Sequence, residues 1–183
     1  MVQEAIQFAI KAHDGQLRKG SEVPYIKHPL EAAVIVSDIR PEETLVTAAI
    51  LHDTIEDCGV TESAIEEQFG SRVAQLVAAE SDDKSRPWAE RKQAMLEALE
   101  EAPEDVKIVA LGDKLSNLRD ICRDYQKTGD CVWKRFTAGS REMVGWYYKG
   151  LRKALGSLSG MPQYQEFSSL VGQMFDGKAP YRS

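Results

Sequence analysis

The segment LHDTIEDCGV, residues 51–60, gathers an imidazole and three carboxylates in the side chains of His52, Asp53, Glu56 and Asp57. An apolar run, TLVTAAIL, leads into it. Acidic side chains this close repel one another and resist burial beside a core. On a helix, Glu56 follows His52 by one turn and Asp57 follows Asp53 by one turn, so that two pairs would share one side. The segment contains no Lys or Arg, which favours a divalent cation as the balancing charge.

Two distant residues could complete a metal site. His28 stands at a helix start in YIKHPLEAA, and Asp113 follows an apolar stretch in IVALGDKLSNLRD. Together with His52 and Asp53 they form a mixed nitrogen and oxygen set, which suits Mn²⁺, Fe²⁺ or Zn²⁺ better than Ca²⁺ or Mg²⁺. Four protein ligands leave an octahedral ion open to water or substrate, as in a catalytic site. A lone histidine is more often structural, and we assign His13 to that class.

Other residues could hold an anionic ligand. Arg18 and Lys19 lie in the loop GQLRKGSEVPY, and Lys84 lies in the polar loop SDDKSRP. Each of these could equally be an ordinary surface charge. Asn117 follows Asp113 by one helical turn, so it would face the same pocket if Asp113 does.

Composition bounds the class of protein. The chain has 183 residues, of which 43% are hydrophobic and 28% charged, so we expect one globular domain. The formal net charge of −6 argues against broad nucleic-acid binding but allows a small anion in a local basic pocket. No apolar run is long enough to span a membrane, and MVQEAIQFAI lacks a signal-peptide layout, so a soluble cytoplasmic protein is expected. Three cysteines without a CxxC pair indicate neither a disulfide framework nor a zinc knuckle.

Helical periodicity dominates the chain, and no segment shows the alternation typical of a strand. Thr61 is expected to cap a helix over 62–69 that stops at Gly70, and Ser71 to cap the next. Residues 81–87 read as a loop and the C-terminal tail as loose. We therefore predict a single all-α helical bundle with helices at 2–13, 29–39, 41–57, 62–69, 71–80, 88–101, 104–124, 131–155 and 162–175.

Four longer segments carry a resemblance to a known family. They are AHDGQLRKGSEVPYIKHPLEAA, AAILHDTIEDCGVTESAIEEQFGSRVAQLV, SDDKSRPWAERK and ALGDKLSNLRD. Their content and order resemble the HD-domain metal-dependent phosphohydrolases, and in particular the Rel/Spo hydrolase domain in its stand-alone small alarmone hydrolases. The resemblance spans residues 5–120, with a motif-bearing core of about 5–125 and C-terminal helices at about 131–175 in a domain of 1–183.

This resemblance implies an all-helical HD fold, a Mn²⁺ ion and hydrolysis of guanosine 3′,5′-bis(diphosphate), ppGpp, at the 3′ position with release of pyrophosphate. His28, His52, Asp53 and Asp113 match its metal ligands. Glu56 and Asp57 match the acidic pair that orients and deprotonates water. Positions that handle substrate phosphates and ribose are matched by Arg18, Lys19, Lys84 and Asn117.

The chain departs from the family pattern in places. The usual Val-Thr before the acid-Lys loop is replaced by Ala79-Glu80-Ser81, and many relatives carry Asp-Arg at Asp113-Lys114. Lys114 itself has a plain interpretation as a solvated charge on its helix. A base-stacking residue is not placed; the candidates by composition are Trp146, Tyr147 and Tyr148.

Alternative functions remain open from the sequence. One is an HD phosphohydrolase for another nucleotide, such as an adenine alarmone or a phosphorylated cofactor. A non-catalytic nucleotide sensor is another, although Glu56 and Asp57 argue against it. A structural helical domain with a fortuitous motif is the third. Nothing in the sequence indicates the oligomeric state.

Overall fold

The computed structural model describes residues 1–82 and 84–177. The chain divides into two compact units, which are described separately below. The first unit comprises residues 1–82 and 105–116. The second unit comprises the described residues of 83–104 and 117–183. The predicted loop 81–87 includes residue 83, and the predicted tail includes 178–183; these positions lie outside the described residues.

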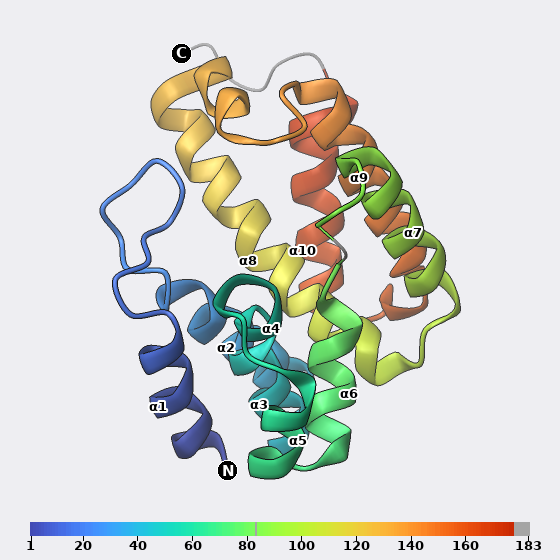
Figure 1. The fold of residues 1–183 in the computed structure, drawn as a ribbon. Helices are drawn as coiled ribbons and strands as arrows, with labels where there is room; N and C mark the ends of the chain where they lie inside the picture. Colours follow the sequence, from blue (N-terminus) through green and yellow to red (C-terminus); the bar gives the residue numbers. More distant parts are fainter. Residues whose placement is uncertain (83, 178–183) are drawn as a thin grey trace. The chain divides into compact units, whose positions relative to one another are not determined.

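The first unit is built from helices that surround α3 (Figure 1). Helix α3 packs against α1, α2 and α6, and α5 packs against α6. Its core is aliphatic, with fully buried side chains such as Leu45, Ile65 and Leu111. The helices are α1 (Val2–Ala12), α2 (Lys27–Ile39), α3 (Glu43–Leu51), α4 (Thr54–Cys58), α5 (Glu62–Phe69), α6 (Ser71–Glu80) and the first half of α8 (Glu104–Thr128).

The second unit has a more aromatic core. Helices α7 and α10 both pack against α9. Tyr148 stacks on Phe175 at a ring distance of 5.8 Å and lies 6.1 Å from Phe167. Its elements are α7 (Trp88–Glu101), the second half of α8, the 3₁₀ turn η1 (Gly129–Arg135), α9 (Arg141–Ala154), η2 (Gly156–Leu158), α10 (Pro162–Val171) and the π-turn η3 (Gly172–Asp176).

The all-α prediction is confirmed. Within residues 1–82 and 84–177 the only extended pairing is an isolated bridge between Leu17 and Pro24. Thr61 caps α5 as predicted, because its side chain accepts a hydrogen bond from the amide of Ala64. Gly70 ends that helix at φ +86°, a conformation that favours glycine. That residues 1–183 form one domain stays a prediction.

Two predicted helices are broken in the structure. The helix predicted over 41–57 is two helices, α3 and α4, which are separated at His52 and Asp53. The helix predicted over 131–155 is α9 alone, preceded by the 3₁₀ turn η1. Neither break carries a proline. The second break was nevertheless signalled in the sequence, because Gly139 has a φ of +70° and the side chain of Ser140 caps α9.

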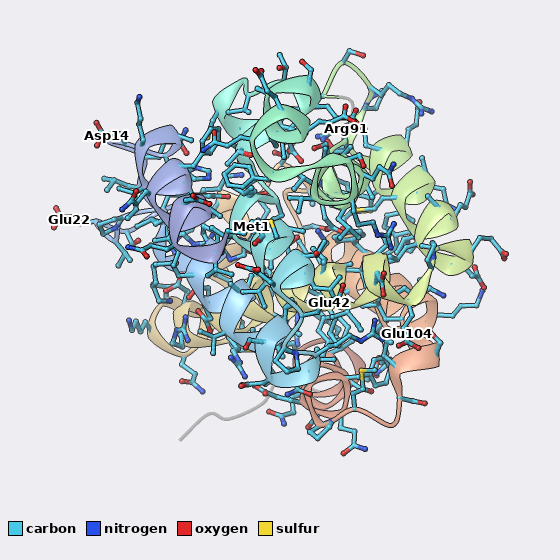
Figure 2. All side chains as sticks on the ribbon, turned by 90° about the horizontal axis from the view of Figure 1, so that it is seen from below. Met1, Asp14, Glu22, Glu42, Arg91 and Glu104 are labelled. Atoms are coloured by element: carbon cyan, nitrogen blue, oxygen red, sulfur yellow. The ribbon has the colours of Figure 1, made fainter. Side chains whose placement is uncertain are left out.

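The loop after α1 carries exposed acidic side chains. Asp14 and Glu22 are exposed and point away from the ribbon (Figure 2). The loop is pinned at its base, where the amide of Tyr25 donates to the carbonyl of Gln16 at 2.9 Å. This hydrogen bond holds the start of α2 close to the end of α1. Among the described residues, no helix combines the length and apolar character needed to cross a lipid bilayer.

Candidate metal centre

The break between α3 and α4 sets the direction of the first two site residues. The ring Nδ1 of His52 lies 2.8 Å from the carbonyl oxygen of Ala49, and the hydroxyl of Thr54 donates to the carbonyl of Leu51 at 2.7 Å. Side chains thus occupy two carbonyls at the end of α3 that a continuing helix would bond through its backbone. With this turn, His52 and Asp53 both reach one point, although on an ideal helix they would be about 100° apart.

Four side chains from separate parts of the first unit converge on that point. The Nε2 atoms of His28 and His52 lie 3.2 Å apart. Asp113 Oδ1 lies 3.1 Å from His28 Nε2, and Asp53 Oδ2 lies 2.9 Å from His52 Nε2. Potential ligand atoms of His28, His52 and Asp113 all lie within 4.8 Å of one another. The structure therefore groups His28, His52 and Asp113 as possible ligands, and Asp53 Oδ2 contacts both imidazoles, at 2.9 Å from His52 Nε2 and 3.5 Å from His28 Nε2.

The outer ring nitrogens show that this set fits a metal. The carbonyl of Ala49 can only accept, so it places the proton of a neutral His52 ring on Nδ1 and leaves the Nε2 lone pair facing the centre. His28 Nδ1 lies 2.9 Å from the hydroxyl of Ser116, which can donate or accept and so holds the ring without placing its proton. Two imidazole nitrogens and two carboxylate oxygens form a donor set suited to a transition-metal ion.

Burial and charge act in opposite directions on the site's pKa values. Burial lowers the pKa of His28, despite the opposing carboxylate of Asp113. Burial also acts to lower the pKa of His52, but the carboxylates of Asp53 and Asp113 outweigh it and hold that pKa well above its usual value. The carboxyl pKa of Asp53 is lowered in turn, because the imidazole of His52 outweighs the effect of burial. The site thus concentrates negative charge around two imidazoles. A bound cation can take the place of a proton on their ring nitrogens.

Asp113 is tied on its other side to a buried ion pair. Its Oδ2 accepts from the ammonium of Lys114, which lies 3.4 Å from Oε2 of Glu80. All three residues are buried. The interpretation of Lys114 as a solvated charge is therefore wrong, because its ammonium is directed into the unit toward two carboxylates.

Tyr25 links the metal-ligand set to the acidic pair. Its hydroxyl donates to Asp53 Oδ2 at 2.7 Å and lies 3.2 Å from Asp57 Oδ2. Burial and the Asp53 carboxylate raise the pKa of Tyr25, so the phenol stays a donor. Asp57 is exposed and Glu56 half-buried, both on the short helix α4. The Tyr25 hydroxyl therefore contacts both Asp57 and the candidate ligand Asp53.

The ring of Tyr25 also contacts two further predicted residues. His13 stacks on it at 4.8 Å, and the Arg18 guanidinium lies 5.4 Å from its centre. His13 is buried and bonds Gln16 at 2.8 Å, which agrees with its assignment as structural. Lys19 is exposed in the same loop. Arg18 thus contacts the ring of the same tyrosine whose hydroxyl contacts Asp53 and Asp57.

The remaining candidates belong to the second unit. Lys84 is exposed and Asn117 is half-buried, and their relation to the metal centre stays a prediction. Tyr147 and Tyr148 are buried, while Trp146 is 38% exposed and lies edge-on to Trp88 at 6.2 Å. Trp146 is therefore the most exposed of the three candidate base-stacking residues.

Several residues of the site were not selected from the sequence. Tyr25 and Ser116 stand inside the quoted motifs, and their spacing from His28 and Asp113 (three residues in each case) was an available signal. Glu80 was noticed only as a departure from the family pattern. Its pairing with Lys114 joins two segments 34 positions apart, which local spacing does not reveal.

Comparison with known proteins identifies the family. A family model described as an HD domain matches residues 5–142. The chain belongs to the HD-domain family. The HD match extends past the motif-bearing core of about 5–125 that the sequence resemblance indicated.

Individual HD relatives agree with this assignment. The chain is 42% identical over 176 residues to a mouse protein, Mus musculus guanosine-3′,5′-bis(diphosphate) 3′-pyrophosphohydrolase MESH1, covering 94% of this chain and 92% of that one. It is 42% identical over 124 residues to the Danio rerio MESH1, covering 66% and 68% respectively. A solved structure described as a metazoan orthologue of SpoT that hydrolyses ppGpp matches with a TM-score of 0.75 at 29% identity, covering 96% of this chain and 93% of that one.

Proposed function

We propose that this protein is a metal-dependent 3′-pyrophosphohydrolase that converts ppGpp and water into guanosine 5′-diphosphate and pyrophosphate. The observation that carries the proposal is the grouping of His28, His52 and Asp113, with Asp53 against both imidazoles and the acidic pair Glu56 and Asp57 on the next helix, α4. The MESH1 relatives and the SpoT orthologue support the choice of substrate.

His28, His52, Asp53 and Asp113 would hold Mn²⁺. When bound, such an ion lowers the pKa of water and polarises a phosphate group. The outer contacts from Ala49 and Ser116 would fix the orientation of the two imidazoles. The mixed donor set does not by itself distinguish Mn²⁺ from Fe²⁺ or Zn²⁺. We choose manganese because the family resemblance implies it.

Glu56 and Asp57 would handle the attacking water. A carboxylate within reach of that water accepts its proton as the oxygen attacks phosphorus. The Tyr25 hydroxyl would hold the Asp57 carboxylate on the side of the ligand Asp53. Positioning of this kind keeps the base close to the metal centre without placing it among the ligands.

Basic and polar side chains would bind the substrate's phosphates and ribose. Arg18 and Lys19 lie in the loop beside Tyr25, and Arg18 contacts its ring. A pyrophosphate group is repelled by an acidic protein, so local cations are required to bind it. Lys84 and Asn117 of the second unit complete the proposed set. We also propose that the protein acts in the cytoplasm on this small nucleotide and binds neither nucleic acid nor membranes.

The test is a direct assay of the reaction. Purified protein, stripped with a chelator and reloaded with Mn²⁺, is incubated with ppGpp, and released pyrophosphate is measured. We expect release with Mn²⁺ and none with the chelated protein. A parallel panel of adenine alarmones and phosphorylated cofactors tests the base. Absence of product from ppGpp together with turnover of another nucleotide would reassign the substrate, whereas binding without any product would favour a sensor.

A further inference from the structure

Glu80 occupies a position that is unfavourable for a carboxylate. It is the last residue of α6, where the negative end of the helix dipole disfavours an anion. Its side chain is only 4% exposed. Burial also raises the pKa of Glu80, against the opposing effect of Lys114. A charged residue kept in such a place requires a compensating partner.

That partner is Lys114, which contacts a candidate metal ligand. Its ammonium lies 3.4 Å from Glu80 Oε2 and also donates to Asp113 Oδ2. The Oδ1 atom of the same carboxylate faces the two imidazoles, 3.1 Å from His28 Nε2. Lys114 therefore fixes which oxygen of Asp113 is turned toward the metal centre.

The pair also affects the charge of the centre. Asp53 and Asp113 provide two negative charges, which match a divalent ion. Lys114 alone would place a positive charge beside that ion and weaken its binding. Glu80 cancels this charge while the hydrogen bond to Asp113 is kept. The charged and titratable groups that act most strongly on Glu80 among the described residues include Lys114, Asp113 and His52.

We propose that Glu80 and Lys114 are positioning residues that act as one buried ion pair, which orients Asp113 and sets the affinity of the centre for a divalent cation. This inference rests on the metal centre proposed above.

The structure offers a matched control in the same two helices. Arg72 of α6 donates to Asp105 of α8 at 2.6 Å, so this pair also joins α6 to α8. It contains no candidate metal ligand and is partly exposed. Replacing Arg72 removes an ion pair between the same helices without touching Asp113.

The experiment measures Mn²⁺ affinity from the EPR signal of the free ion, with circular dichroism to verify folding. Glu80→Gln keeps the shape and an acceptor for Lys114 but removes the charge. We expect it to weaken Mn²⁺ binding about 10-fold, and Glu80→Val to weaken it by 10- to 100-fold, the range found for outer-shell partners. Arg72→Gln should leave the affinity within about twofold of the wild type.

A double variant and a rescue separate positioning from general stability. Glu80→Val combined with Lys114→Met removes both charges and should bind Mn²⁺ more tightly than Glu80→Val alone. Excess Mn²⁺ should restore pyrophosphate release by Glu80→Gln to the wild-type rate, which a merely structural defect would not allow.

The inference is overturned if Glu80→Gln binds Mn²⁺ as the wild type does, or if Arg72→Gln weakens Mn²⁺ binding as much as Glu80→Gln does. In those cases a wild-type protein that binds Mn²⁺ and releases pyrophosphate leaves the proposed function standing. A wild type that binds no Mn²⁺ overturns the metal centre and this inference together.

Discussion

At the scale of single residues, the centre shows a division between buried and accessible groups. His28 and His52 are fully buried, whereas Asp57 is exposed on α4. The Tyr25 hydroxyl connects the two layers through Asp53 and Asp57. Binding of the ion and handling of water are therefore assigned to different carboxylates.

This division predicts that substitutions of the acidic pair affect turnover and not the metal. Glu56→Gln and Asp57→Asn should each reduce the rate of pyrophosphate release. The variant that removes the general base should reduce this rate by about 10²–10⁴-fold. Mn²⁺ affinity should stay near that of the wild type, because neither residue is among the ligands. Initial rates and EPR titrations of the same samples test both statements. Full turnover in both variants would remove the pair from the mechanism.

The metal ligands could be selected from the sequence because their residue types are costly without a cation. The adjacent His52-Asp53 after an apolar run suggested a metal site, and His28 and Asp113 were added as candidates that the family resemblance also matches; that these residues bind a metal stays a prediction. Lys114 was misjudged for the opposite reason. A lysine on a helix is normally solvated, and only the three-dimensional position of Glu80 shows why this one is buried.

At the scale of elements, the site depends on close packing between α2 and α8. A Cβ atom on Gly112 would lie 2.6 Å from Val36 Cγ2 and 2.9 Å from the carbonyl oxygen of Ala32. The latter is a backbone atom of α2, which cannot move away as a side chain can. The neighbour of Gly112 in the chain is Asp113, so this contact also sets the depth of a candidate ligand.

Gly112→Ala should therefore destabilise the protein despite the better helix propensity of alanine. Overpacking costs about 1–3 kcal/mol, and the gain in propensity of about 1 kcal/mol offsets part of it. Denaturant unfolding measures the difference. Gly156→Ala serves as the control, because no heavy atom lies within 4 Å of the added carbon. Equal stability of the two variants would contradict the proposed close contact.

A second element-scale prediction concerns pH. The guanidinium groups of Arg72 and Arg40 hold the pKa of Asp105 below its ordinary value and join α6 and α2 to α8. A carboxyl pKa that is lower in the folded protein stabilises it above the unfolded value of about 3.9. This contribution is lost as the pH falls through the folded pKa.

Asp105→Asn should therefore be less stable than the wild type near neutral pH, and the difference should shrink on acidification. Urea unfolding of both proteins between about pH 7 and about pH 3 provides the measurement. A difference that is constant over this range would show that Asp105 acts through packing and not through its charge.

The helix boundaries show which local signals were sufficient. Thr61 and Gly70 act through side-chain capping and a positive φ, which are properties of single residues, and both boundaries were predicted. The break at His52 depends on side chains that compete for the carbonyls of Ala49 and Leu51. Both His52 and Asp53 keep near-helical dihedral angles. The turn therefore needs no glycine or proline, and the residue types alone did not indicate it.

At the scale of the whole molecule, the metal centre joins segments that lie far apart in the sequence. Its candidate ligands come from α2, from the turn between α3 and α4, and from α8. An ion that binds the folded chain and not the unfolded one adds to the free energy of unfolding by mass action. Metal binding and folding of the first unit should thus be coupled.

We expect Mn²⁺ to stabilise the protein by about 2.7 kcal/mol at a free concentration 100 times its Kd. Thermal unfolding with and without Mn²⁺ measures the shift in Tm, and addition of a chelator should reverse it. Mg²⁺ at the same concentration should give a smaller shift, since it prefers oxygen ligands. No shift at a Mn²⁺ concentration that saturates the EPR titration would contradict the coupling.

The depth of the candidate ligands has a consequence for how the protein is handled. His28 and His52 are 1% exposed and Asp113 is 5% exposed, so an ion seated among them would be reached by solvent from the side of Asp53, whose side chain is 17% exposed. Release from the buried imidazoles still requires a transient local opening, which makes exchange slow even where equilibrium affinity is modest. A preparation would keep the element it acquired during expression. Cultures grown with different trace metals would consequently yield the same polypeptide with different bound metals.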